Sequence, residues 1–200
     1  MGKTRGDESL SNLGHRLGGL GSCSGNTIES LRATIDKVSD PLFLYWEFDV
    51  HESADGILFV YHDNDIEMDG EMVLVKGLEM ESLKNAGVQL GFQIPTFTEV
   101  ISELSERNEN TMIEIKNLIS DKARREVITA MVGHPNWTLM ATPLRFTASF
   151  PSESRAHWHS EVRKAGTKLV RVGRHRIDLF SAAKTRLGWM LAKPKWLFGF

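Results

Sequence analysis

Cysteine is nearly absent from this chain of 200 residues, which contains one, Cys23. A single thiol forms no internal disulfide and cannot build a thiolate zinc site, so the fold must depend on burial of apolar side chains. Long apolar runs are missing too: no stretch approaches the roughly 20 apolar residues that cross a bilayer. The charged first residues also lack the apolar stretch of a signal peptide. We therefore expect a cytoplasmic protein.

The net charge of −2 is small but unevenly distributed. Residues 1–150 contain 13 Lys and Arg against 23 Asp and Glu, whereas residues 151–200 contain 11 against 3. The last segment, 185–200, combines basic side chains with Trp and Phe, a composition typical of membrane interfaces. Two interpretations stay open: this segment contacts a membrane surface, or its aromatic side chains cover an apolar end of the fold.

The hydrophobic pattern predicts one α/β domain over residues 1–200. With 41% hydrophobic and 25% charged residues, the chain can build one sizeable core. Helical spacing and capping residues alternate with short apolar runs, which favours a parallel sheet or an α/β barrel. The expected helices are 26–38, one after the Thr96/Glu99 capping box, 120–132 and 152–165; the expected strands are 42–50, 57–61, 111–116, 137–140 or 145–150, and 168–172.

Two glycine-punctuated segments interrupt this alternation. Residues 13–25 are predicted to form a strand end that leads into a flexible loop. Residues 64–93 are predicted to be an insertion with little regular structure, in which Met68, Met72 and Met80 fill gaps in the core.

Charged side chains interrupt the buried strands, where they are costly unless paired or bound to a metal. Glu47 and Asp49 are two residues apart and so share one strand face, as do Glu114 and Lys116. Three converging carboxylates suit a hard divalent cation such as Mg²⁺ or Ca²⁺. The alternatives are an exposed acidic strand face and a simple ion pair between Glu114 and Lys116.

Six short motifs in order carry a resemblance to a known family. They are Gly14-His15-Arg16, Asn26-Thr27, Trp46-Glu47-Phe48-Asp49-Val50, Asp55-Gly56 with His62-Asp63, Ile94-Pro95-Thr96 with Glu99-Val100, and Ile113-Glu114-Ile115-Lys116. Over residues 13–116, their order and spacing resemble the glycerophosphodiester phosphodiesterase family.

The resemblance implies a TIM-type (β/α)8 barrel that hydrolyses small-molecule glycerophosphodiesters to glycerol 3-phosphate and an alcohol, a reaction of lipid metabolism that requires a divalent cation, Mg²⁺ or Ca²⁺. It implies no nucleic-acid partner. The matching positions are two general acid-base histidines, two phosphate-binding cations and three metal ligands: His15 and His62; Arg16 and Lys116; Glu47, Asp49 and Glu114.

The chain departs from the family pattern in three places. Leu17 stands where the family has Gly after His-Arg, and Gly25 where it has Glu before Asn-Thr. The closing strands have no counterpart after Lys168, so we expect a barrel shortened or incomplete at the C-terminus, whose open edges a partner chain, a second copy or the tail would cover. Two alternative functions follow: a degenerate family member that binds phosphate esters without turnover, and a membrane-surface protein that uses segment 185–200.

Overall fold

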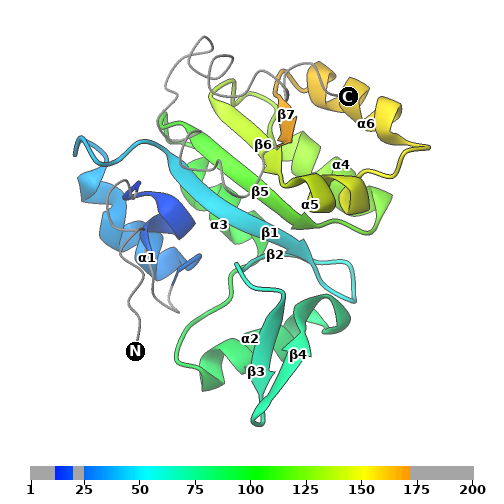
Figure 1. Cartoon of the computed structure of the whole chain (residues 1–200). Coiled ribbons are helices and arrows are strands. Elements are labelled where there is room, and N and C mark those ends of the chain that lie inside the picture. The colour runs from blue at the N-terminus through cyan, green and yellow to red at the C-terminus, as the bar shows by residue number, and fades with distance from the viewer. Residues whose placement is uncertain (1–11, 20–24, 172–200) are drawn as a thin grey trace, which may run out of the picture.

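The computed structural model of this chain describes residues 12–19 and 25–171. Cys23 and segment 185–200 therefore lie outside the described residues. One five-stranded sheet, in the order β2-β1-β5-β6-β7, forms the centre (Figure 1). Its strands are β1 Trp46–Glu52, β2 Leu58–Val60, β5 Thr111–Asn117, β6 Trp137–Ala141 and β7 Leu169–Arg171.

Four of these strands, β1, β5, β6 and β7, are parallel, as the βα alternation predicts. The exception is β2, which we expected to join a parallel sheet but which pairs antiparallel with β1. The connection between them is too short for a crossover and closes on itself: Ser53 accepts through Oγ from the Ile57 N–H at 3.0 Å, and Gly56 adopts a positive φ of 75°. A tight turn of this kind joins antiparallel strands only.

Helices follow two of the parallel strands, β5 and β6, and others lie between the remaining elements. They are α1 Ile28–Thr34, α2 Met80–Gln89, α3 Phe97–Leu104, α4 Asp121–Ala130, α5 Pro143–Ser149 and α6 Arg155–Lys164, with 3₁₀ turns η1 His15–Gly18, η2 Ile35–Lys37 and η3 Val75–Gly77. The capping box at Thr96 and Glu99 is confirmed. Residues 145–150, one of two candidates for a strand, lie in α5, so the next strand is β6.

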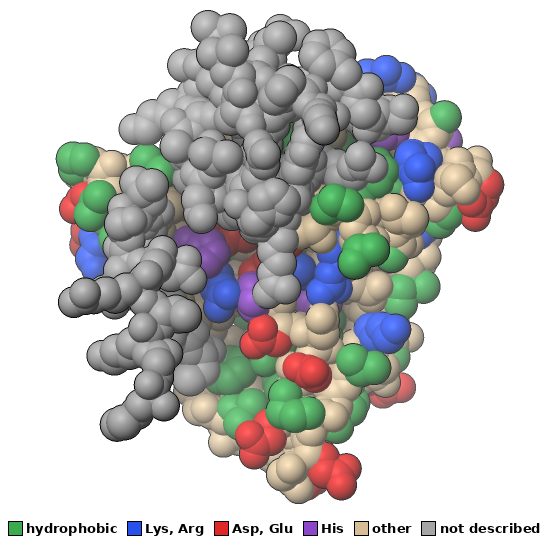
Figure 2. Space-filling view, viewed as in Figure 1, with side chains coloured by type: hydrophobic (Ala, Val, Ile, Leu, Met, Phe, Trp, Pro, Cys, Tyr) green, Lys and Arg blue, Asp and Glu red, His purple; other side chains and the backbone are tan. Residues whose placement is uncertain are grey.

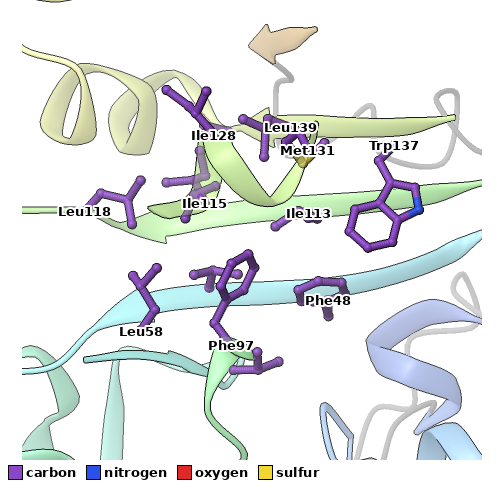
Figure 3. Close-up of a cluster of buried hydrophobic side chains, with 14 of the residues drawn as sticks. Phe48, Leu58, Phe97, Ile113, Ile115, Leu118, Ile128, Met131, Trp137 and Leu139 are labelled. Carbon is purple, nitrogen blue, oxygen red and sulfur yellow. The ribbon is translucent and has the colours of Figure 1, made fainter. Parts of the chain in front are cut away.

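Each strand of the sheet has two buried faces with different chemistry. Alternate residues such as Phe48, Ile113 and Leu139 point into the main apolar core, where Phe97 of α3 and Ile128 of α4 pack against them (Figure 3). This core explains why the strands are buried along nearly their whole length, as predicted from their apolar composition.

The opposite face of the same strands carries the polar side chains. Glu47 and Asp49 alternate with the core residues of β1, and Glu114 and Lys116 do so on β5. Met112 of β5, with its buried neighbour Met140 on β6, forms a small apolar cluster on this face, next to the acids. The polar side chains therefore lie next to a layer of packed apolar side chains.

The insertion at 64–93 has regular structure, contrary to our expectation. It forms an antiparallel hairpin of β3 Asp65–Met68 and β4 Glu71–Leu74, followed by α2, and these elements lie together beyond β2 (Figure 1). Ile66 and Leu83 build a second core that includes Phe59 of β2. This added burial makes the short strands stable. Met72 is not part of the core as expected, since it is 63% exposed.

The expected strand end at residues 13–25 is absent from the described residues 12–19. This segment instead bonds to the chain before β1, through the Leu13 N–H to the Leu42 carbonyl, and then turns into η1. Among the described residues, no helix is long and apolar enough to span a membrane.

Candidate active site

Strand register brings the three carboxylates together. Asp49 of β1 lies directly opposite Glu114 of β5, and Glu47 is on the same face one step back along β1. One carboxylate oxygen from each of the three lies within 4.8 Å of the other two, and all three side chains are buried. The convergence follows from the parallel register, because Glu47 and Asp49 share one face of β1 and Glu114 lies on the same face of the neighbouring strand β5.

Lys116 is the basic member of this cluster. Its Nζ lies 2.8 Å from Asp49 Oδ1 and 3.0 Å from Glu114 Oε1. Burial alone would lower the pKa of Lys116, but the two carboxylates raise it above its ordinary value. Burial would likewise raise the pKa of Asp49, yet the Lys116 ammonium, His62 and a hydrogen bond from Asn26 hold it below its usual range. Lys116 and Asp49 therefore stay charged.

With Glu47 and Glu114 included, the carboxylates of the cluster outnumber its one ammonium group, that of Lys116. Burial raises the pKa of Glu47 well above its usual value, and the charges of Asp49 and Glu114 raise it further. The pKa of Glu114 is raised by burial and by Asp49. Three buried carboxylates thus share one ammonium. Oxygen donors in this arrangement are a donor set that a divalent cation would fit.

The two histidines are joined to this cluster through Arg16. The Arg16 backbone N–H donates to Glu47 Oε2 at 2.9 Å, and His15 Nε2 lies 3.6 Å from the same oxygen. The Arg16 guanidinium lies 2.7 Å from His62 Nε2. Histidine, basic and acidic side chains gather near the middle of the face shown in Figure 2.

His62 is oriented by partners on both ring nitrogens. Its Nδ1 lies 2.7 Å from Asp63 Oδ1, while Nε2 faces the guanidinium, which can only donate. This network assigns the proton to Nδ1 and leaves a lone pair on Nε2. Burial lowers the pKa of His62, and burial and Arg16 lower that of His15. Both imidazoles are therefore neutral near pH 7.

The two departures from the family pattern have a structural explanation. Leu17 adopts a positive φ of 56°, a conformation that glycine enters freely and leucine does not, and its side chain is fully buried. At Gly25, a Cβ atom would lie 2.8 Å from the Gly19 carbonyl oxygen and 3.2 Å from the Arg16 Cβ. Arg16 thus packs where a side chain at position 25 would begin.

Three residues near the site were missed by sequence reasoning. Asn26, the first residue of the predicted helix 26–38, lies outside α1: it has a positive φ of 65° and donates from Nδ2 to Asp49 Oδ2 at 2.8 Å, while Thr27 and Ser30 form the capping box. Arg145 of α5 donates to the Lys116 carbonyl oxygen at 2.9 Å. His51, buried on β1, stacks on Phe59. The Asn-Thr motif was a signal for Asn26; no sequence signal pointed to the other two.

The structure therefore joins all seven residues that the sequence singled out into one network of contacts. Its hydrogen bonds and ion pairs form two groups, one of His15, Glu47, Arg16 and His62 and one of Lys116, Asp49 and Glu114. The two groups meet where oxygens of Glu47, Asp49 and Glu114 lie within 4.8 Å of one another. Buried carboxylates, neutral imidazoles and two cations in one place are the groups that phosphate-ester hydrolysis requires. The individual role of each residue stays a prediction.

Comparison with known proteins points to one family. The sequence profile of the glycerophosphoryl diester phosphodiesterase family matches residues 15–161. A search of curated proteins found no match. The structure resembles that of the glycerophosphodiester phosphodiesterase of Thermotoga maritima, with 20% identity and a TM-score of 0.53, over 96% of this chain and 72% of that one.

Two further solved structures are similar. A Galdieria sulphuraria protein has 19% identity and a TM-score of 0.59, over 81% of this chain and 64% of that one. A glycerophosphoryl diester phosphodiesterase domain from Mycobacterium tuberculosis has 15% identity and a TM-score of 0.53, over 84% of this chain and 62% of that one. At these identities the structural likeness shows a shared fold. This chain spans under two thirds of the last two structures.

Proposed function

This chain belongs to the glycerophosphoryl diester phosphodiesterase family, whose fold is a TIM-type barrel, and from that premise we propose that it hydrolyses glycerophosphodiesters to glycerol 3-phosphate and an alcohol with a divalent cation and two histidines. The observation that carries the proposal is the single network that joins both imidazoles to the three buried carboxylates.

The carboxylates of Glu47, Asp49 and Glu114 would hold the cation. Their charge excess over Lys116, together with the raised pKa of Glu47 and Glu114, is what an additional positive ion would relieve. When bound, a Mg²⁺ or Ca²⁺ ion supplies positive charge to the phosphate oxygens.

His62 is the residue that we assign as general base. The Nε2 lone pair accepts from the Arg16 guanidinium in this structure; once that guanidinium turns to the phosphate, Nε2 can accept a proton from the attacking hydroxyl or water. Asp63 on Nδ1 holds the ring and stabilises the imidazolium that results. His15 would protonate the leaving alkoxide from its imidazolium form, which the negative phosphate and Glu47, 3.6 Å from its Nε2, would favour once the substrate is bound. Arg16 and Lys116 balance the charge of the phosphate, which grows in the transition state.

The test is turnover of glycerophosphocholine by the purified chain with Mg²⁺ or Ca²⁺, measured as the release of glycerol 3-phosphate. We expect His15→Ala and His62→Ala to lower kcat by at least about 100-fold, in line with the effect of general acid-base groups. His157→Ala, at an exposed position on α6, is the matched control and should retain wild-type activity. Equal background rates in all four proteins would refute the proposal.

A second candidate is binding of phosphate esters without turnover, which the departures at Leu17 and Gly25 favour. Both positions adjoin Arg16, whose guanidinium occupies His62 Nε2; if it stays there when a phosphate ester binds, the ester is held while the nitrogen needed for base catalysis is blocked. Calorimetric titration with glycerol 3-phosphate separates the two candidates: binding in a protein that shows no turnover supports the second.

A further inference from the structure

One pocket of the molecule is shared by the site and the insertion. It has a volume of about 250 Å³, below the roughly 300–1,000 Å³ of pockets for drug-sized ligands, so it suits a small group. Arg16 and His62 line one side. The other lining residues come from the loop before α1, the end of β2, the β3–β4 hairpin and the chain after α2: Gly25, Tyr61, Asp63, Glu67, Met72, Leu90 and Phe92.

Much of the remaining pocket lining is aromatic and apolar. The Tyr61 and Phe92 rings are stacked, with centroids 6.2 Å apart and an interplanar angle of 5°. Met72 and Leu90 are 63% and 40% exposed, although neighbouring apolar residues of the insertion are buried in its core. A wall of this kind binds methyl groups and cations well and hydroxyl groups poorly.

A carboxylate completes this wall. Glu67 and Met72 are direct cross-strand partners in the hairpin, so their side chains share the face that lines the pocket. The surroundings are acidic as well: residues 63–81 contain seven Asp or Glu and one Lys. Figure 2 shows acidic and hydrophobic side chains side by side over the lower part of the molecule, where Figure 1 places the hairpin.

The pocket lining therefore carries both charges. Arg16, in contact with the proposed base His62, provides a cation where a phosphate would be held. Glu67, on the hairpin, and the aromatic rings provide negative charge and π faces in the same pocket. A phosphate ester whose alcohol carries a quaternary ammonium group has the same polarity, anion first and methylated cation next.

Building on the proposed function, we infer that this pocket binds the alcohol part of the substrate and selects phosphodiesters of choline-type alcohols over those of neutral alcohols. Tyr61 and Phe92 contact the N-methyl groups, Glu67 neutralises the ammonium charge, and Met72 and Leu90 exclude water. The insertion is thus the specificity-determining element of the site.

The test compares glycerophosphocholine with its 3,3-dimethylbutyl isostere, which has the same shape without the charge. Wild type should prefer the choline ester in kcat/KM by about 5- to 30-fold, the range that one cation–π and charge contact provides. Glu67→Gln and Phe92→Leu should reduce this preference toward unity, through KM and not kcat. Glu71→Gln, an exposed acid of the same hairpin that does not line the pocket, should keep it.

Two results would overturn the inference: equal turnover of both esters by wild type, or an unchanged preference in Glu67→Gln and Phe92→Leu. Failure of the proposed function is distinguishable, since it abolishes turnover of both esters. In that case saturation-transfer NMR with choline tests the pocket directly: a signal in wild type that is lost in Phe92→Leu supports it, and no signal in wild type refutes it.

Discussion

Some residues near the site have an unfavourable backbone conformation or a buried titratable side chain, and the packing around them maintains these states. Arg16 and Leu17 both have positive φ, at 50° and 56°, and this turn directs the Arg16 N–H toward Glu47 and its guanidinium toward His62. His51 is held in the interior with its imidazole neutral. Such states are maintained by packing and cost stability, so each leads to a prediction that can be measured in unfolding experiments.

At Leu17 we expect the backbone conformation to reverse the usual order of stability, in which an Ala variant is more stable than a Gly variant. Leu17→Ala should cost about 2–5 kcal/mol of unfolding free energy, because the side chain is fully buried. Leu17→Gly should be at least as stable as Leu17→Ala, since the left-handed conformation costs an L-residue roughly 1–2 kcal/mol that glycine avoids.

Urea unfolding of both variants in EDTA measures this order. Leu31 of α1 is the matched control: it is equally buried but helical, so Leu31→Gly should be less stable than Leu31→Ala by about 1 kcal/mol. If Gly is the less stable substitution at both positions, position 17 has no left-handed strain.

His51 predicts a pH dependence of stability. Burial is the main cause that lowers the pKa of His51, to about 3, from the ordinary value of 6.5. Between these two values the unfolded chain binds a proton that the folded protein excludes, so the unfolding free energy must fall as the pH falls from 6.5 toward 3. One such group contributes a slope of about 1.4 kcal/mol per pH unit.

We expect His51→Gln to flatten this slope by about 1 kcal/mol per pH unit between pH 6 and pH 4. The measurement is denaturant unfolding at several pH values in EDTA, which keeps metal binding out of the comparison. The exposed His157→Gln is the control, and its slope should equal that of wild type. Parallel curves for wild type and His51→Gln would mean that the buried imidazole accepts a proton in the folded state.

At the level of elements, short strands and helices are stabilised by local hydrogen bonds and by packing on the sheet. The chain enters α3 through Thr96, whose backbone also forms an isolated bridge to Phe59 of β2. Thr96 Oγ1 accepts from the Glu99 N–H at 3.2 Å, and Glu99 Oε2 accepts from the Thr96 N–H at 2.7 Å. This capping box lies at the junction between the insertion and the main core.

Removing the cap should weaken this junction. We expect Thr96→Ala to lower the unfolding free energy by about 1 kcal/mol, the usual effect of losing an N-cap side chain. Thr98→Ala, at an exposed position in the first turn of the same helix, should change it by less than about 0.5 kcal/mol. Equal effects of the two substitutions in urea unfolding would show that the cap adds nothing to α3.

For the molecule as a whole, the acid cluster should link stability to divalent cations. A ligand that binds only the folded state adds about 2.7 kcal/mol at 100 times its Kd, which corresponds to roughly 5–10 °C in Tm for a chain of this size. We expect Mg²⁺ or Ca²⁺ to raise the Tm of wild type in calorimetry and to leave Glu47→Gln unchanged.

In EDTA, without a bound cation, the Tm of wild type should no longer exceed that of Glu47→Gln. Burial and the neighbouring acids raise the pKa of Glu47, so its charged form opposes folding at neutral pH. Glu47→Gln should then unfold at the same temperature as wild type or above it. A metal-induced rise in Tm that survives Glu47→Gln would exclude this carboxylate as a ligand.

The sequence alone determined the alternation of strands and helices and indicated the candidate site residues, because hydrophobic period, caps and short motifs are local properties. It located Glu47, Asp49, Glu114 and Lys116 on strand faces without showing which strands are neighbours. Where apolar spacing was irregular, as in residues 64–93, the expectation of little structure was wrong, since apolar side chains of that segment such as Ile66 and Leu83 pack with Phe59 into a second core.

Only the tertiary structure decided how these parts meet. The parallel register sets Asp49 opposite Glu114, and the fold brings Asn26 to Asp49 and Arg16 to His62. These contacts join residues far apart along the chain. They exist because the whole chain buries its apolar surface in one arrangement, and no local stretch of sequence contains that information.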